Sequence, residues 1–249
     1  MANISAANSG ARAGKPLAGG VALVTGSSRG IGRAIAQRLA QLGAAVSLCG
    51  RNKEALMRTA EELRVLGVSV HAQSADVTQA GEIASLVEAT EKTLGPITIL
   101  VNNAGIGGFG PAHEKSEEEW DLVLNTNLKS VFLVSRAVVP AMIRRGGGDI
   151  INISSLAGKN TFAGGGVYCA SKWGLQGLAG CMAEDLRGYG IRVSIICPGS
   201  VATEFAGRGP KDPTKTLTAE DVAHAVGMVA VQGPQSFISE IHVRPVAKP

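Results

Sequence analysis

The stretch that decides the fold is VALVTGSSRGIG, residues 21–32, which begins with five apolar or β-branched residues and ends on three glycines in seven positions. The apolar run predicts a buried strand, and the amphipathic segment Arg33–Leu42 predicts a helix directly after it. Glycines between a strand and a helix allow a tight turn and a close approach of the backbone to a phosphate. The helix amino terminus then offers unpaired N–H groups to that phosphate. The spacing, G-x-x-x-G-x-G, therefore predicts a phosphate-binding loop at the start of an α/β domain.

The alternation of strand and helix continues along the whole chain. Strands are predicted at 21–25, 45–49, 68–73, 97–102, 150–154, 193–197 and 237–243, and helices at 31–42, 53–66, 79–94, 117–145, 168–187 and 218–231. Strands that are apolar nearly throughout, joined by crossovers of ten or more residues, indicate a parallel sheet covered on both faces. We therefore predict a flexible leader over residues 1–19 and a single catalytic domain over 20–249. Its fold class is α/β, a doubly wound parallel sheet of the Rossmann type with about seven strands and helices on both faces.

Composition excludes several other classes of protein. Of the 249 residues, 45% are hydrophobic and 18% charged, and the net charge of +4 is dispersed along the chain, with only 4% aromatic residues. A nucleic-acid binder usually concentrates its basic residues and pairs them with aromatic platforms. The apolar runs are too short for a membrane span, and the amino terminus lacks the apolar core of a secretory signal. The four cysteines are widely spaced, which indicates reduced thiols rather than a metal site. We expect a cytoplasmic protein that binds no nucleic acid, no membrane and no metal.

The end of the second predicted strand carries a guanidinium where an NAD site needs an acid. A carboxylate about 20 residues past the glycine loop holds the ribose hydroxyls of NAD, but residues 47–52 contain Arg51 and no Asp or Glu. Arg51 and Arg29, from the glycine loop, can together grip a 2′-phosphate. The alternative is that both arginines are ordinary solvated residues. The sequence favours NADP(H) over NAD(H) as cofactor.

Residues suited to acid–base chemistry follow the later strands. The fourth strand runs into Asn103-Ala104-Gly105, the fifth ends in Ser154-Ser155, and Asn127 lies in a long helical stretch. Tyr168 and Lys172 have the i, i+4 spacing that places two side chains on one helix face. A phenol with a pKa near 10 is a poor catalyst at neutral pH, and a nearby ammonium lowers that pKa. Taken alone, this spacing more often marks an exposed helical Tyr beside a Lys; together with the other motifs it indicates a Tyr–Lys acid–base catalyst.

These motifs, in this order and on this α/β pattern, closely resemble the short-chain dehydrogenase/reductase family over about residues 17–203. The resemblance implies that Tyr168 is the general acid in reduction or the base in oxidation. It implies that Lys172 depresses the pKa of that phenol and holds the nicotinamide ribose. Ser155 would hydrogen-bond the substrate carbonyl, and Asn127 would hold a water that relays protons with Lys172. The implied cofactor contacts are Gly26, Ser28, Arg29, Gly30, Ile31, Gly32, Arg51, Asn52, Asp76, Val77, Asn103, Ala104, Gly105, Tyr168, Lys172, Pro198, Gly199, Val201 and Thr203.

The activity that the resemblance implies is NADPH-dependent hydride transfer between nicotinamide and a carbonyl or secondary alcohol. The front two-thirds of the chain are similar to 3-ketoacyl-(acyl-carrier-protein) reductases, whereas the carboxyl end, Phe237–Pro245, is closer to members that act on small carbonyls or hydroxy acids. A ketoacyl reductase of fatty-acid synthesis is therefore an alternative to a generic carbonyl reductase. Two further alternatives are an NAD-linked alcohol dehydrogenase and a dinucleotide-binding module without turnover.

The remaining expectations concern the substrate loop and assembly. Residues 200–215, rich in Gly, Pro and Lys, predict a short lid in which Arg208 is a candidate carboxylate ligand or a solvated residue. The helical stretches 117–145 and 168–187 carry apolar residues beyond one core stripe, including Leu128, Phe132, Leu175 and Leu178. In the family such helices form a four-helix contact between subunits, so the resemblance implies a homodimer or homotetramer.

Overall fold

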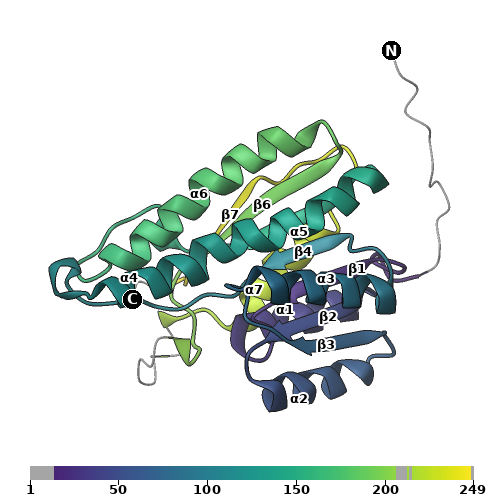
Figure 1. Ribbon diagram of the computed structural model, residues 1–249, viewed down its shortest axis with the longest axis horizontal. Helices are drawn as coiled ribbons and strands as arrows, with labels where there is room; N and C mark the ends of the chain where they lie inside the picture. The colour runs from purple at the N-terminus through teal and green to yellow at the C-terminus, as the bar shows by residue number, and fades with distance from the viewer. Residues whose placement is uncertain (1–13, 206–211, 213–214, 248–249) are drawn as a thin grey trace.

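The computed structural model describes residues 14–205, 212 and 215–247 (Figure 1). Within these residues one parallel sheet has the order β3-β2-β1-β4-β5-β6-β7. The strands are β1 (Val21–Thr25), β2 (Ala45–Gly50), β3 (Val70–Ser74), β4 (Ile99–Asn102), β5 (Gly148–Ile153), β6 (Ile191–Pro198) and β7 (Glu240–Val243). The α-helices are α1 (Gly30–Gln41), α2 (Lys53–Arg64), α3 (Ala80–Leu94), α4 (Glu117–Leu124), α5 (Ser130–Arg145), α6 (Gly166–Arg187) and α7 (Ala219–Ala230). The strand order reverses between β1 and β4, which confirms the predicted doubly wound sheet.

Helices bury the sheet on both faces. On one face α1, α2 and α7 pack on alternate strand residues such as Ala22 and Val24. On the other face α3, α5 and α6 pack on the residues between them, such as Val21 and Leu23. Figure 1 shows α5 and α6 passing in front of β6 and β7. This two-sided burial explains why β1 reads as a continuous apolar run rather than an alternating one.

Two helices begin at capping boxes. Ser116 Oγ accepts a hydrogen bond from the Glu119 N–H at 3.2 Å, and Glu119 Oε2 accepts one from the Ser116 N–H at 3.1 Å. Thr218 and Asp221 form the same reciprocal pair at the start of α7. Each box satisfies two N–H groups that the helix itself leaves unpaired, and so fixes where the helix begins.

The predicted helix 117–145 is helical throughout, but its α-helical hydrogen bonding changes to a π-helical turn at Asn125–Lys129, between α4 and α5. By length and hydropathy alone this stretch also passes for a membrane span. In the fold, however, α5 lies on the sheet with Val134, Val138 and Met142 buried in the core. Packing inside the domain accounts for part of its apolar composition, since 39% of the apolar window is buried.

The exposed apolar residues differ in part from those expected. Leu175 is only 1% exposed and belongs to the core, so the prediction that it lies outside the core stripe is wrong. Leu128 packs against Gly174 of α6: a Cβ added to Gly174 would lie 2.8 Å from the Leu128 Cδ2. Phe132 is 47% exposed, as expected. Three further apolar side chains of these helices, which the sequence analysis did not single out, are also exposed: Trp120, Leu122 and Trp173.

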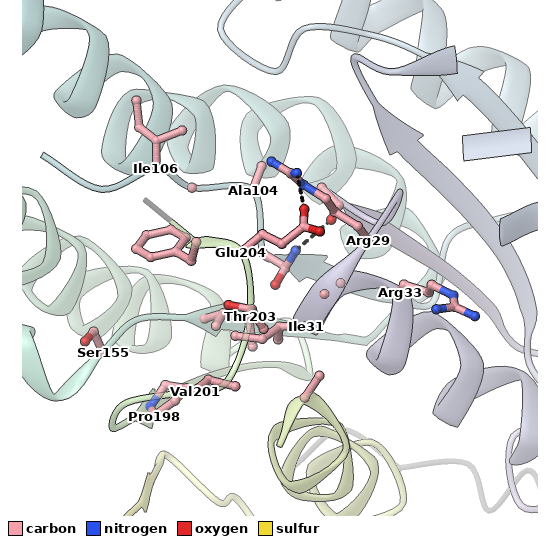
Figure 2. A pocket seen from close by; sticks show the side chains of 18 of the residues that line it. Arg29, Ile31, Arg33, Ala104, Ile106, Ser155, Pro198, Val201, Thr203 and Glu204 are labelled. Atoms are coloured by element: carbon pink, nitrogen blue, oxygen red, sulfur yellow. Dashed lines mark hydrogen bonds and ion pairs between the residues drawn. The ribbon is translucent and has the colours of Figure 1, made fainter. Parts of the chain in front are cut away.

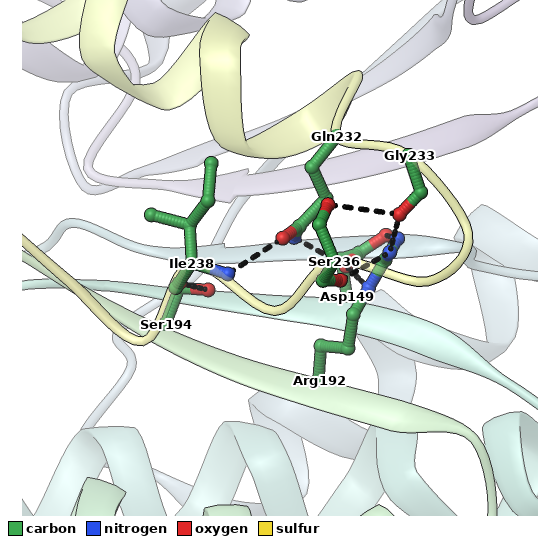
Figure 3. Close-up of polar contacts among 7 residues, drawn as sticks. All are labelled: Asp149, Arg192, Ser194, Gln232, Gly233, Ser236 and Ile238. Carbon is green, nitrogen blue, oxygen red and sulfur yellow. Dashed lines mark hydrogen bonds and ion pairs between the residues drawn. The ribbon is translucent and has the colours of Figure 1, made fainter.

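The last strand begins later than predicted because side chains take the hydrogen bonds of the residues before it (Figure 3). Arg192 binds Asp149 through two contacts of 2.7 and 3.0 Å, and its Nη1 also donates to carbonyls in the loop 233–236. Gln232 Oε1 accepts from the Ile238 N–H at 2.7 Å. This segment is therefore held as a loop, and β7 starts at Glu240 instead of Phe237.

At the other end of the chain, contact with the domain begins before residue 20. The N–H of Leu17 donates to the Leu42 carbonyl at 2.9 Å, and its side chain packs against the core. This bond joins the residues before β1 to the end of α1.

Candidate active site

A cavity of about 1400 Å³ opens at the carboxyl ends of the strands. It is lined by the segments that follow β1 to β6, and all 19 residues expected to contact the cofactor lie on its wall. Ser155 lines it as well, whereas Asn127 is buried behind it. Figure 2 shows Ser155, Pro198, Val201 and Thr203 on one side, across from Arg29 and Arg33. The topology thus brings the predicted cofactor residues and the predicted catalytic residues to one crevice.

The glycine loop is shaped to leave a helix amino terminus open to this crevice. Gly26 and Gly30 have φ values of 64° and 54°, which favour glycine. A Cβ added to Gly26 would lie 2.9 Å from Ala104 Cα, and one added to Gly32 would collide with the Gly26 carbonyl. Arg29, the residue before α1, makes no side-chain capping bond. The first N–H groups of α1 therefore remain available to a phosphate.

Asn103 and Thr25 join this loop to the end of β4. Thr25 Oγ1 accepts hydrogen bonds from the N–H groups of Asn103 and Ala104, at 3.0 and 3.1 Å. Asn103 Nδ2 donates to the carbonyls of Thr25 and Gly26, at 2.9 and 3.1 Å. These bonds fix the segment after β1 to the segment after β4, and both would lie beneath a dinucleotide.

The wall beside β2 carries more arginines than expected. Arg51 is exposed at the end of β2, and Arg58 of α2 lines the same wall. Sequence reasoning missed Arg58, although its spacing of three residues from Ala55 places both on one face of α2. Arg29 does not stand alone: its Nη1 donates to Glu204 Oε2 at 2.7 Å, across the crevice (Figure 2). Glu204, from the segment after β6, was also missed.

Three candidate catalytic side chains meet at the other end of the crevice. Tyr168 lies in the first turn of α6 and hydrogen-bonds with Ser155, at the end of β5. Lys172 lies one turn further along α6, where its Nζ donates to the Ile153 carbonyl at 2.9 Å. That ammonium nitrogen is 5.9 Å from the centre of the Tyr168 ring. The i, i+4 spacing and the end of β5 thus assemble the group that the sequence predicted.

Burial opposes the acidity that was expected of the phenol. Burial raises the pKa of Tyr168 to about 12, and the hydrogen bond with Ser155 offsets only part of that rise. Burial also lowers the pKa of Lys172 to about 8. Removal from water dominates both groups, since each charged form loses its hydration inside the fold. Tyr168 therefore carries its proton at neutral pH, and the lowering of its pKa by Lys172, which is not among the causes of this shift, stays a prediction.

Asn127 occupies the π-helical turn and is almost completely buried. Its Oδ1 accepts from the Ile106 N–H at 2.8 Å, and its Nδ2 donates to the Ile106 carbonyl at 2.9 Å and to Ser171 Oγ at 3.0 Å. A Cβ added to Gly105 would lie 3.3 Å from Asn127 Oδ1 and 3.8 Å from Lys172 Nζ. Asn127 thus ties the segment after β4 to α6 beside the lysine. The water relay implied for it stays a prediction.

Sequence reasoning also missed a polar cluster on β6 and β7. Cys197, Glu240 and His242 present ligand atoms within 4.8 Å of one another, because Cys197 pairs with His242 across the two strands. Lys159 Nζ contacts Glu240 at 3.0 Å, and Glu240 also bonds His242 at 2.6 Å. Burial raises the pKa of the Cys197 thiol to about 11. The carboxylate already has cationic and hydrogen-bonding partners, so the cluster holds the strand ends together.

The segment expected to form a lid is described through Phe205, at Asp212 and from Lys215 onward. Arg208, the candidate carboxylate ligand, lies outside the described residues. Pro198, Gly199, Val201 and Thr203 all line the crevice on this side.

An open helix amino terminus, an arginine-lined wall and a Tyr–Lys–Ser group on one crevice define a dinucleotide-dependent oxidoreductase. The sequence matches the family described as short chain dehydrogenase over residues 20–213. The chain belongs to this family, which confirms the resemblance seen in its motifs.

Relatives and solved structures agree with this assignment. The chain is 43% identical over 188 residues to a putative ketoacyl reductase of Streptomyces coelicolor, covering 75% of this chain and 72% of the relative. It is similar to a metagenomic short-chain oxidoreductase in complex with NADP, with 44% identity and a TM-score of 0.83 over 93% of this chain and 100% of the other. It is also similar to a variant of actinorhodin polyketide ketoreductase with NADPH, with 33% identity and a TM-score of 0.86 over 93% and 98% of the two chains.

Proposed function

We propose that this protein is an NADP(H)-dependent oxidoreductase that reduces a carbonyl group to a secondary alcohol. The observation that carries the proposal is the meeting of Tyr168, Ser155 and Lys172 at one end of a crevice whose other end is lined by arginines. Such a crevice has room for a dinucleotide with its reactive ring beside the phenol. Catalysis by Tyr168, Lys172 and Ser155, with Asn127 as a positioning residue, belongs to this proposal.

The preference for NADP(H) follows from the charges at the arginine end. The amino terminus of α1 would hold the pyrophosphate, and Arg51 and Arg58 would hold a 2′-phosphate. Residues 47–52 include no acid for the ribose hydroxyls that NAD presents. The two similar solved structures described above contain NADP and NADPH, which supports the same choice. When bound, the cofactor supplies the hydride.

The chain's own residues would supply the proton and stabilise the developing charge. The Tyr168 hydroxyl donates its proton to the carbonyl oxygen, and Ser155 donates a hydrogen bond to the same oxygen. The Lys172 ammonium stabilises the phenolate that remains. Because its pKa is about 12, Tyr168 is already protonated at neutral pH, as reduction requires.

The test is NADPH oxidation with a panel of ketones, β-keto thioesters and semialdehydes. We expect turnover with a higher kcat/KM for NADPH than for NADH. A higher kcat/KM with NADH would instead support an NAD-linked alcohol dehydrogenase. NADPH binding without oxidation by any carbonyl would support a non-catalytic module.

A β-ketoacyl thioester is the second candidate substrate. The relative from Streptomyces coelicolor is named a putative ketoacyl reductase, and this chain covers 72% of it. In the same panel, a kcat/KM for β-keto thioesters well above that for simple ketones would establish this activity.

Assembly and location also belong to the proposal. We infer a cytoplasmic homodimer or homotetramer formed through α4, α5 and α6, where Trp120, Phe132 and Trp173 are each about half exposed. Pairing these faces would remove large apolar side chains from water. Light scattering tests this directly, and a monomeric mass would reject it.

A further inference from the structure

Two phenylalanine rings pack against the phenol of Tyr168, and a third packs against one of them. The centre of the Phe109 ring lies 5.3 Å from that of Tyr168, and Phe205 lies 5.9 Å from it in an edge-on arrangement. Phe162 contacts Phe109, with 6.1 Å between the ring centres. All three rings line the crevice. The chain has only five phenylalanines, so three of them gather where a substrate would meet the proton donor.

The rings come from three separate loops, and two of those loops are joined. Phe109 follows β4, Phe162 follows β5 and Phe205 follows β6. The Gly110 N–H donates to the Gly164 carbonyl at 2.8 Å, which fixes the first two loops to each other. Phe162 packs so closely on Gly165 that a Cβ there would lie 2.7 Å from the ring. One face of the Phe162 ring is thus held in place, while 44% of the residue remains exposed.

Charged groups are few at this end of the crevice. Among the described residues that line it there, Lys172 is bonded to the Ile153 carbonyl and Glu204 to Arg29. The other charged lining residues come from the segments after β1, β2 and β3, from α2, and from the starts of α1 and α7. A substrate carboxylate beside the rings would therefore lose its hydration without gaining a cationic partner from these residues.

We propose that the substrate is an uncharged ketone that carries an aryl or other planar apolar group beside its carbonyl. The planar group packs against Phe109, Phe162 and Phe205, while the carbonyl oxygen faces Tyr168 and Ser155. This inference rests on the proposed function. The reaction is unchanged: hydride reaches the carbonyl carbon from NADPH and the Tyr168 proton reaches its oxygen, giving NADP⁺ and the secondary alcohol.

Four ketones of graded chemistry test the proposal in the wild-type protein with NADPH. Acetophenone has the planar group, cyclohexyl methyl ketone has the same size without planarity, 4-acetylbenzoate adds a carboxylate, and 2,3-butanedione is a small reactive control. Ring pairs contribute roughly 0.5–1.5 kcal/mol beyond burial, which corresponds to about two- to twelvefold in kcat/KM per ring. We expect acetophenone to exceed both cyclohexyl methyl ketone and 4-acetylbenzoate by about tenfold or more.

Two variants separate substrate contact from support of the phenol. Phe162→Leu and Phe109→Leu keep apolar volume but remove a ring, and Tyr189→Leu removes an aromatic ring of similar exposure outside the crevice. We expect the acetophenone preference to fall about three- to tenfold in the first two variants, mainly through KM. The readout is the ratio of kcat/KM for acetophenone to that for 2,3-butanedione, which carries no ring for the phenylalanines to contact. Tyr189→Leu should match wild type with all four ketones.

The outcomes distinguish this inference from the function beneath it. If 2,3-butanedione or cyclohexyl methyl ketone is reduced but acetophenone is no better, the aryl inference is wrong while the reductase remains. It is also wrong if the phenylalanine variants lower kcat equally for every ketone, since the rings would then only support Tyr168. If β-keto thioesters or semialdehydes are reduced but none of the four ketones is, the aryl inference is wrong while the reductase remains. If NADPH binds and no carbonyl compound of either panel is reduced, the proposed function itself fails.

Discussion

Replacing Lys172 with methionine should stabilise the fold while it destroys activity. The side chain is buried, and burial lowers its pKa from 10.5 to about 8. Since one pKa unit corresponds to about 1.4 kcal/mol, the charged lysine destabilises the folded state by about 3 kcal/mol below pH 8. Methionine has a similar length and no charge. The Ile153 carbonyl, which accepts from Lys172 Nζ at 2.9 Å, loses its donor at a cost of about 1–2 kcal/mol. The net gain at pH 7 is about 1–2 kcal/mol.

The gain should depend on pH in a defined direction. Between about pH 8 and 10.5 the folded lysine is neutral and the unfolded one is still charged, so the destabilisation fades as pH rises. At pH 10 it is below about 1 kcal/mol, and the variant should have no advantage. Urea denaturation at pH 7 and pH 10 measures both values. Lys92→Met, at an exposed position on α3, is the control and should change stability little at either pH.

Two results would refute this reasoning. One is a Lys172→Met protein less stable than wild type at pH 7. The other is a stability gain of the same size at pH 7 and pH 10, because a gain from removing buried charge must shrink as the lysine becomes neutral.

Three further substitutions test other parts of the account. Ser155→Ala should lower kcat by about 10²-fold with the Kd for NADPH unchanged, because a donor to the carbonyl oxygen is lost; steady-state kinetics decide, and an unchanged kcat removes Ser155 from the mechanism. Arg51→Ala should raise the Kd for NADPH about tenfold or more while that for NADH stays the same, as measured by fluorescence titration; equal losses for both cofactors would count against a 2′-phosphate contact. Arg192→Ala leaves the Asp149 carboxylate without its two-point partner (Figure 3). It should lower the free energy of unfolding by roughly 3 kcal/mol with kcat unchanged. A loss below about 1 kcal/mol in denaturant unfolding would show that the ion pair is dispensable.

Local patterns in the sequence predicted most of the fold. The bounds of β1 match because its five residues are all buried and apolar or β-branched. The start of β7 was missed because the groups that hold the preceding loop, Arg192 and Gln232, lie outside the strand segment in the sequence. A side-chain bond over more than 40 residues leaves no periodic signal.

The site was predictable where its residues are close in the sequence. Tyr168 and Lys172 share a helix face, so their spacing alone places them together. The pKa of the phenol was not predictable, because its burial involves rings from loops after β4 and β6 that only the fold brings near. The pair of Arg29 and Glu204 was missed for the same reason, since 175 residues separate its members.

The central claim is that Tyr168 gives its proton to a carbonyl oxygen, and Tyr168→Phe tests it most directly. The substitution removes one hydroxyl and keeps the ring that packs against Phe109 and Phe205. The Kd for NADPH should stay within about twofold of wild type, and kcat with a reduced ketone should fall by about 10²–10⁴-fold, the range for loss of a general acid. A variant that binds NADPH normally and keeps a kcat near that of wild type would contradict the claim.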